Sequence, residues 1–191
     1  MAVAYLSPDA ASGTSGWNGS YSSTASHLAQ GETSNEWRSV FLSTAKATFT
    51  LSDFSQTFSS ITKIEHVIVC RLDARGGSAV IQGKIMDGTG PSSYYTENFT
   101  NPAGALLVTL TGTARTTSDG SSAWTDSDLD GLGLQITCTG GPFVHVIQQM
   151  YIKVTYVEPS GYGNAVNGIA ATDISEINGI ATASISKVNG V

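Results

Sequence analysis

The sequence predicts an all-β protein, an antiparallel β-sandwich of the jelly-roll type with a C-terminal extension built on a short repeat. Three observations favour this fold. Charged residues make up only 13% of the 191 residues and there are 21 glycines, which suits short strands and many turns better than helical bundles. Apolar and polar residues alternate in successive runs, as they do in half-buried strands. No segment predicts a helix longer than one turn.

The elements are expected in the following order. Residues 1–36 indicate a loop-rich segment with one or two short edge strands, in which Tyr5, Leu6, Trp17 and Leu28 are the expected core anchors. Strands are predicted at 37–43, 46–54, 61–75, 78–87 and 105–114, from about 132, and at 143–159, with a loop over 87–95. The long final strand and the long connections favour a jelly roll over an immunoglobulin topology.

Two details of these strands can be tested directly. In the run 46–54, Ala47, Phe49 and Leu51 share one face, while Lys46, Thr48 and Thr50 share the other, so the first set should be buried. Gly76-Gly77 separates the runs 61–75 and 78–87, and a diglycine between two strand-like runs is a hairpin signal. We therefore expect these two strands to pair with each other.

The chain divides into a sandwich over 1–159 and a repeat-containing tail over 160–191. The tail repeats an 11-residue unit twice and begins it a third time, and its matching positions are Val166, Asn167, Gly168, Ile169, Ile174, Ile177, Asn178, Gly179, Ile180, Ile185, Val188, Asn189 and Gly190. An 11-residue period can give a right-handed helical supercoil, but Asn and Gly in every unit disfavour a helix. Asn-Gly instead predicts turns between apolar positions.

The apolar rows of this tail need a partner surface. One chain cannot bury these apolar rows. Its two complete units and the start of a third fall short of the three repeats that a stable stack needs. Three chains could form an intertwined prism, which would make the protein a homotrimer. The tail could instead lie as an arm on its own sandwich or on a neighbouring subunit, or it could be a mobile end. We expect it to act as an assembly element.

Charge and cysteine content exclude several partners. The net charge is −6 and the few Lys and Arg residues are scattered, so no nucleic-acid binding is expected. No apolar run is long enough to span a membrane, and the N-terminus lacks the pattern of a signal peptide, which predicts synthesis in the cytoplasm. Cys70 and Cys138 each lie in a strand-like run and are expected to be buried thiols. No cofactor is expected.

The acidic turn formed by Asp126, Asp128 and Asp130 imitates the start of a calcium loop. That loop needs a bidentate carboxylate at its twelfth position, which is occupied here by Thr137. Thr125 and Asp128 instead match a capping box for a one-turn helix. We therefore predict a capped turn and no metal site, with Trp124 closing one end of the sandwich.

No catalytic residue is expected, because no hydrolase, metalloprotease or nucleotide-binding motif is present. His27, His66 and His145 are far apart, and Glu65 and Asp73 share a strand-like run, whereas a glycosidase needs two carboxyl groups across a cleft. The best candidate for a ligand platform is the pair Tyr94 and Tyr95, which follows Gly90-Pro91 and could present aromatic rings to a sugar.

Several stretches resemble β-sandwich virion proteins of tailed bacteriophages. They are AYLSPDAASGTSGW at the start, NPAG, SSAWTDSDLDGLGLQI with its "AWT-x-x-D-L" turn, and VIQQMYIKVTYVE in the last strand. The tail, with NGIA, INGIA and ISKVNGV, is similar to short "NG" repeats at the C-termini of phage structural proteins. The resemblance implies a lectin-like jelly roll on the virion surface, as a capsid decoration or as part of a tail or fibre. It implies other virion proteins as partners, and it carries no catalytic residue.

Two other function classes compete with a virion structural role. A carbohydrate-binding module, attaching to host or environmental glycans, would use the same sandwich. Exposed coplanar aromatic residues would favour that class, and polar flat sheet faces would count against it. An enzyme such as a glycan depolymerase would need a carboxylate pair in a groove.

Overall fold

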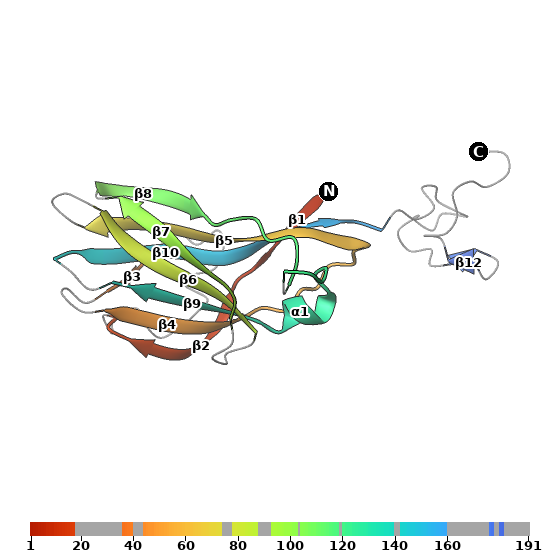
Figure 1. Ribbon diagram of the computed structural model, residues 1–191, viewed down its shortest axis with the longest axis horizontal. Helices are drawn as coiled ribbons and strands as arrows, with labels where there is room; N and C mark the ends of the chain where they lie inside the picture. Colours follow the sequence, from red (N-terminus) through yellow and green to blue (C-terminus); the bar gives the residue numbers. More distant parts are fainter. Residues whose placement is uncertain are drawn as a thin grey trace.

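The protein is a sandwich of two antiparallel sheets packed against each other (Figure 1). The computed structural model describes residues 1–17, 36–39, 44–73, 78–87, 93–102, 104–118, 120–139, 142–159, 176–177 and 180–181. Among these residues, no helix is long and apolar enough to cross a membrane.

Sheet A has the strand order β1-β10-β5-β8 and sheet B the order β2-β4-β9-β6-β7. The strands of sheet A are β1 (Ala2–Leu6), β5 (Ser60–Asp73), β8 (Gly104–Thr111) and β10 (Val144–Val157), and β3 (Trp37–Arg38) also pairs with β10. The strands of sheet B are β2 (Pro8–Ser15), β4 (Ala45–Leu51), β6 (Ser78–Asp87), β7 (Ser93–Pro102) and β9 (Leu132–Cys138). A short helix, α1 (Asp126–Asp130), precedes β9, and β11 (Glu176–Ile177) pairs with β12 (Ile180–Ala181).

This strand order confirms the predicted jelly roll. Four strands of sheet A, in the order β1-β10-β5-β8, oppose four strands of sheet B, in the order β4-β9-β6-β7. Successive strands thus alternate between the sheets, except for the β6–β7 hairpin, and this connectivity is that of two interlocked Greek keys. Strand β2 extends sheet B beyond β4, so the N-terminal segment supplies edge strands to both sheets, as expected.

The core lies between the sheets, where every second residue points inward. The predicted alternation in β4 is confirmed: Ala47, Phe49 and Leu51 are buried, whereas Lys46 is exposed. Further core residues on the facing strands include Ile64, Ile68, Leu134, Ile136 and Ile152, all fully buried. Burying one such side chain contributes roughly 1.5–3 kcal/mol, so this shared interior is the main source of stability.

A β-bulge in β10 explains why its apolar pattern is irregular. Ile147 pairs with Cys70 and points into the core, but after a register shift between Ile147 and Gln149 the inward residues become Met150 and Ile152. One extra residue reverses the faces of the strand from that point onward. Val146 precedes the bulge and is adjacent to Ile147. Its side chain therefore points away from the core between the sheets, although it is fully buried. Val146 pairs with Arg38 of β3.

The predicted hairpin between residues 61–75 and 78–87 is wrong. Strand β5 is a central strand of sheet A, between β10 and β8, whereas β6 belongs to sheet B, between β9 and β7. The chain therefore crosses from one sheet to the other between these strands. Long-range pairing overrides the local turn signal here: β5 pairs with β10 along most of its length and also with β8, whereas β6 pairs with β9 and β7.

Three local predictions also need correction. The expected loop over 87–95 ends earlier, because β7 begins at Ser93. Of the strand predicted at 37–43, only Trp37–Arg38 is a strand, and residues 40–43 lie outside the described residues. Tyr5 is not a core anchor, since 43% of it is exposed, although its neighbour Leu6 is buried. Adjacent residues of a strand point to opposite sides, so only one of the two can face the core. Leu28 lies outside the described residues.

Candidate functional site

The "AWT" turn forms the short helix that the capping box predicted. The hydroxyl of Thr125 accepts a hydrogen bond from the backbone N–H of Asp128, and the carboxylate of Asp128 accepts one from the backbone N–H of Thr125 at 2.8 Å. The capping box is thus confirmed. Leu129, a residue of this helix, is fully buried. Among the described residues, no group of three or more His, Cys, Asp or Glu side chains could hold a metal ion.

The turn also closes one end of the sandwich. Trp124 is 3% exposed, and its indole N–H donates to the backbone carbonyl of Arg115 at 3.1 Å. Asp130, at the end of α1, accepts a hydrogen bond at 2.8 Å from the backbone N–H of Phe54, a residue 76 positions earlier. Figure 1 shows α1 at this end of the two sheets. The motif behind the phage resemblance therefore holds together loops that are distant in sequence.

The predicted platform of Tyr94 and Tyr95 lies at the start of β7. Tyr95 is half-buried, its hydroxyl donates to the backbone carbonyl of Thr117, and the guanidinium carbon of Arg115 lies 4.4 Å from its ring centroid. The ring is thus already stacked by a cation from its own chain. The side chain of Tyr94 lies outside what the structure describes, so a ligand platform at these two residues stays a prediction.

Most predicted assembly residues of the tail lie outside the described residues. Those are Val166, Asn167, Gly168, Ile169, Ile174, Asn178, Gly179, Ile185, Val188, Asn189 and Gly190. The described part is the β11–β12 pair, in which Ile177 pairs with Ile180. The assembly role of the tail stays a prediction.

Both cysteines and two histidines are buried in the sandwich. Cys70 and Cys138 are free thiols, as expected, and burial raises the pKa of Cys70 to about 12 and that of Cys138 still further. His66 points between the sheets against the ring of Phe99, and burial lowers its pKa to about 3. Burial also lowers the pKa of His145. Thiols and imidazoles held neutral in this way are inert packing groups at neutral pH.

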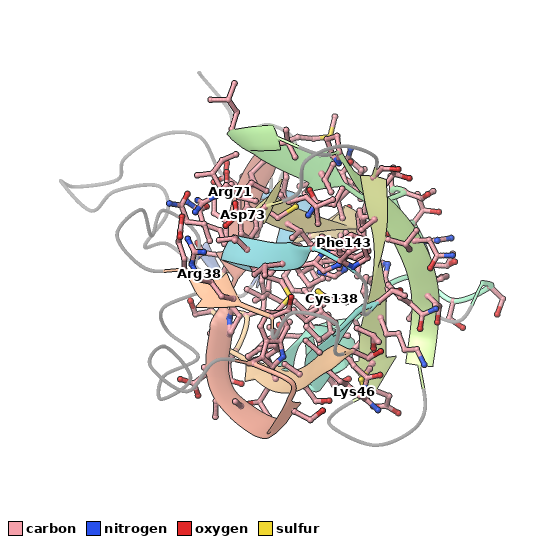
Figure 2. All side chains as sticks on the ribbon, turned by 90° about the vertical axis from the view of Figure 1, so that its left-hand side faces the viewer. Arg38, Lys46, Arg71, Asp73, Cys138 and Phe143 are labelled. Carbon is pink, nitrogen blue, oxygen red and sulfur yellow. The ribbon has the colours of Figure 1, made fainter. Side chains whose placement is uncertain are left out.

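A charged network lies at the end of the sandwich opposite to α1. Arg71 binds both oxygens of Glu36 and donates to Asp73 at 3.1 Å, while Arg38 donates to Asp73 at 2.9 Å. Figure 2 shows Arg38, Arg71 and Asp73 side by side on this end. The hydrogen bond from Arg71 to Glu36 raises the pKa of Arg71. Two cations and two carboxylates cancel, so the network ties the residues before β3 to β5 without creating a charged patch.

A second ion pair lies between the edges of the two sheets. Glu97 of β7 accepts hydrogen bonds at 2.8 Å from Arg115 and from the backbone N–H of Thr113. Its other oxygen is buried and lies against Gly112, where an added Cβ would approach it to 1.8 Å. The absence of a side chain at position 112 makes room for the carboxylate.

The outer face of sheet B is polar. Its cross-strand rows are Thr48–Gln135–Lys84–Thr96 and Lys46–Thr137–Gln82–Asn98. The amide of Gln135 donates to Thr48 at 3.1 Å. These two rows contain no aromatic ring, and a polar face of this kind counts against a sugar-stacking surface here.

The outer face of sheet A carries aromatic and charged side chains, among them Tyr5, which the sequence pattern predicts to be a core anchor. Tyr5 and Tyr151 meet edge to face, with ring centroids 5.4 Å apart. Beside them, Glu65 is paired with Lys63 at 3.0 Å and with Lys153 at 3.6 Å. Alternation in AVAYL, with Leu6 and Tyr5 on opposite sides, is the signal that could have placed Tyr5 outside.

A cleft of about 250 Å³ opens beside Tyr5, between the free edge of β1 and the loop that follows β4. The residues that line it are Val3, Ala4, Tyr5, Leu6, Asp53, Phe54, Ser55 and Gln56. A shallower depression of about 460 Å³ lies on the other side of the same loop, against Asp126 of α1. This end of the molecule therefore combines concavity, an exposed aromatic ring and exposed polar groups.

No family model matches the chain, and no curated protein matches it. Among solved structures, it is similar to the enzymatically active domain of tailspike protein 4 of bacteriophage CBA120, with 8% identity and a TM-score of 0.42, over 81% of this chain and 19% of that one. It is also similar to a family 11 carbohydrate-binding module from Clostridium thermocellum, with 14% identity and a TM-score of 0.39, over 82% of this chain and 89% of the module. An isomalto-dextranase from Arthrobacter globiformis matches with 12% identity and a TM-score of 0.32, over 66% of this chain and 17% of that one.

Proposed function

We propose that the protein is a non-catalytic structural component of the virion surface of a tailed bacteriophage, as a capsid decoration or as part of a tail or fibre. It would be made in the host cytoplasm and would assemble as a homotrimer, and with other virion proteins, through its C-terminal repeat. The observation that carries the proposal is the combination of a jelly-roll sandwich with a repeat-containing tail, whose NGIA, INGIA and ISKVNGV stretches resemble the short "NG" repeats of phage structural proteins.

The structure supports this proposal by giving the resembling motifs definite positions. The AWT turn is the capped helix α1 with the buried Trp124, and the VIQQMYIKVTYVE stretch is β10, which pairs with β1, β3 and β5. In the tail, the described pairing joins Ile177 to Ile180 and Glu176 to Ala181. The matched apolar positions can be buried only against another surface, and each large side chain so buried would contribute roughly 1.5–3 kcal/mol.

The proposal is tested on the tail of the full chain. We expect Ile174→Ser, Ile180→Ser and Ile185→Ser, introduced together, to lower the oligomeric state measured by sedimentation while leaving the melting temperature of the sandwich unchanged. Deletion of 160–191 should act in the same way and more strongly, and Gly179→Val more mildly, because a β-branched residue is poorly tolerated at positive φ. Ser184→Ala and Ser186→Ala are the matched control. An unchanged oligomeric state together with undiminished incorporation into particles would refute the assembly role.

A further inference from the structure

The edges of the two sheets differ in how they are protected. Of the strands that the structure describes, β1 and β8 border sheet A, and β2 and β7 border sheet B. β2 begins at Pro8 and its pairing with β4 has two register shifts, while β7 ends at Pro102 and carries the largely buried carboxylate of Glu97. Prolines, bulges and inward charges keep an edge from pairing with another chain. β1 and β8 contain neither a proline nor a charge, so sheet A has the unprotected edges.

β1 is further distinguished by the cleft of about 250 Å³ that follows it, which is lined by its residues 3–6. Successive side chains of a strand point to opposite faces, so a cleft lined by four consecutive residues follows the edge of the strand. It exposes very little apolar surface. Every second residue of an antiparallel edge strand leaves its N–H and C=O unpaired, and these are the groups that a further strand would bind.

The wall facing β1 carries one charged side chain, Asp53, which is exposed. Both of its neighbours in the chain are anchored. The N–H of Ser52 donates to the carbonyl of Ser7 at 2.9 Å. The N–H of Phe54 donates to the carboxylate of Asp130 at 2.8 Å. A segment lying in the cleft therefore meets a negative charge on a fixed wall, and a second carboxylate within the roughly 10 Å reach of that charge is disfavoured.

The second repeat unit of the tail matches this cleft. Residues 181–186 read ATASIS, in which small or apolar residues alternate with hydroxyl-bearing ones, as in a strand with two different faces. The segment is uncharged, and its first residue belongs to the strand β12. The corresponding residues of the first unit, 170–175, include Asp173, which Asp53 would repel. The second unit is therefore the better occupant.

The direction of the strands favours a segment from a second copy. β10 ends at Val157 beside the start of β1, where Ala2 pairs with Tyr156 (Figure 1). A tail that turned back from Val157 along its own β1 would run parallel to that strand, whereas a neighbour's tail can run antiparallel, which is the slightly more stable pairing. Residues 158–181 span up to about 80 Å when extended, which is enough to reach a neighbouring sandwich.

We propose that the cleft along β1 binds residues 181–186 of a second copy of the chain, as an antiparallel strand that extends sheet A. This inference rests on the proposed assembly role of the tail and names the surface that receives it. Ala181, Ala183 and Ile185 would face the core side, and the hydroxyl-bearing residues would share the outer face with Val3. In a closed ring, each subunit gives its tail to the next one and receives one in return, so every cleft is filled.

The test is disulfide cross-linking between two co-expressed variants of the full chain, whose own two cysteines are buried. One variant carries Val3→Cys, at a side chain that is 44% exposed. The other carries Thr182→Cys, Ser184→Cys or Ser186→Cys in turn. After oxidation with diamide, we expect at least one tail position to give a mixed dimer on a non-reducing gel. Leu106→Cys, in place of Val3→Cys, is the matched control at the other edge of sheet A and should give at least tenfold less cross-link.

A second test uses the charge of Asp53. Ser184→Asp should weaken self-association severalfold in sedimentation, because it places a carboxylate in the cleft. Asp53→Asn should have little effect alone and should restore most of the association that Ser184→Asp loses. The melting temperature, which both variants should leave unchanged, shows that the sandwich remains folded.

The outcomes separate this inference from the assembly role itself. If no mixed dimer forms although the tail variants still lower the oligomeric state, the cleft is not the receiving surface, and the assembly role stands. A cross-link within one chain would assign the cleft to the chain's own tail and overturn the proposal. An effect of Ser184→Asp that Asp53→Asn does not relieve would also overturn it. A chain that sediments as a monomer at every concentration would refute both the cleft and the assembly role.

Discussion

The two ends of the sandwich are closed by opposite means. At the α1 end, Trp124, Leu129 and Phe54 are each at most 5% exposed and pack into the core. At the other end, the side chains of Arg38, Arg71, Glu36 and Asp73 keep between 16% and 37% of their surface exposed and are joined by ion pairs. Burial stabilises in proportion to the apolar area removed from water, whereas ion pairs that stay partly exposed to water contribute about 1 kcal/mol or less. The α1 end should therefore dominate stability.

The comparison is tested most strongly by Trp124→Ala. We expect the free energy of unfolding to fall by about 3–5 kcal/mol, as for other large-to-small core substitutions, because the indole fills the end of the core and donates to Arg115. Chemical denaturation measures the loss, with Leu106→Ala as an exposed control that should change it by less than about 0.5 kcal/mol. A loss below about 1 kcal/mol would mean that the α1 end does not close the core in the way described.

His66 is buried between the sheets, as the residues at the α1 end are, but its side chain can ionise, as those of the charged residues at the other end can. Its folded-state pKa of about 3 lies below its unfolded value of 6.5, so stability is fully present above pH 6.5 and is lost as the pH falls from 6.5 towards 3. Linkage gives a loss of about 3 kcal/mol between pH 7 and pH 4. His66→Leu should flatten this dependence in denaturation curves recorded across that range. The same pH slope in the natural chain and in the variant would show that other groups carry it.

The parts of the fold that depend on short-range patterns could be predicted from the sequence. The faces of β4 follow from alternation at Ala47 and Phe49, and the capping box follows from Thr125 and Asp128, three residues apart. The assignment of β5 and β6 to different sheets, and the bulge after Ile147, depend on pairing with strands far along the chain. The cleft brings Tyr5 together with Asp53 and Gln56 across such a distance, and no local spacing signals that contact.

The charged end should give the smallest effect. Arg71→Gln removes the hydrogen bonds to Glu36 and Asp73, and we expect a loss of about 1 kcal/mol, since a network with a half-buried arginine stands at the upper end of the range for surface pairs. Arg38→Gln should cost less than about half of that, because Arg38 is more exposed and its loss leaves the Arg71–Glu36 pair intact. Both losses should shrink in about 1 M salt, where screening is strong, whereas the loss in Trp124→Ala should persist. Denaturation of the three variants at low and high salt measures this difference directly. If Arg71→Gln destabilised the protein as much as Trp124→Ala at either salt concentration, the charged end would be an equal partner in stability, and the contrast between the two ends would not hold.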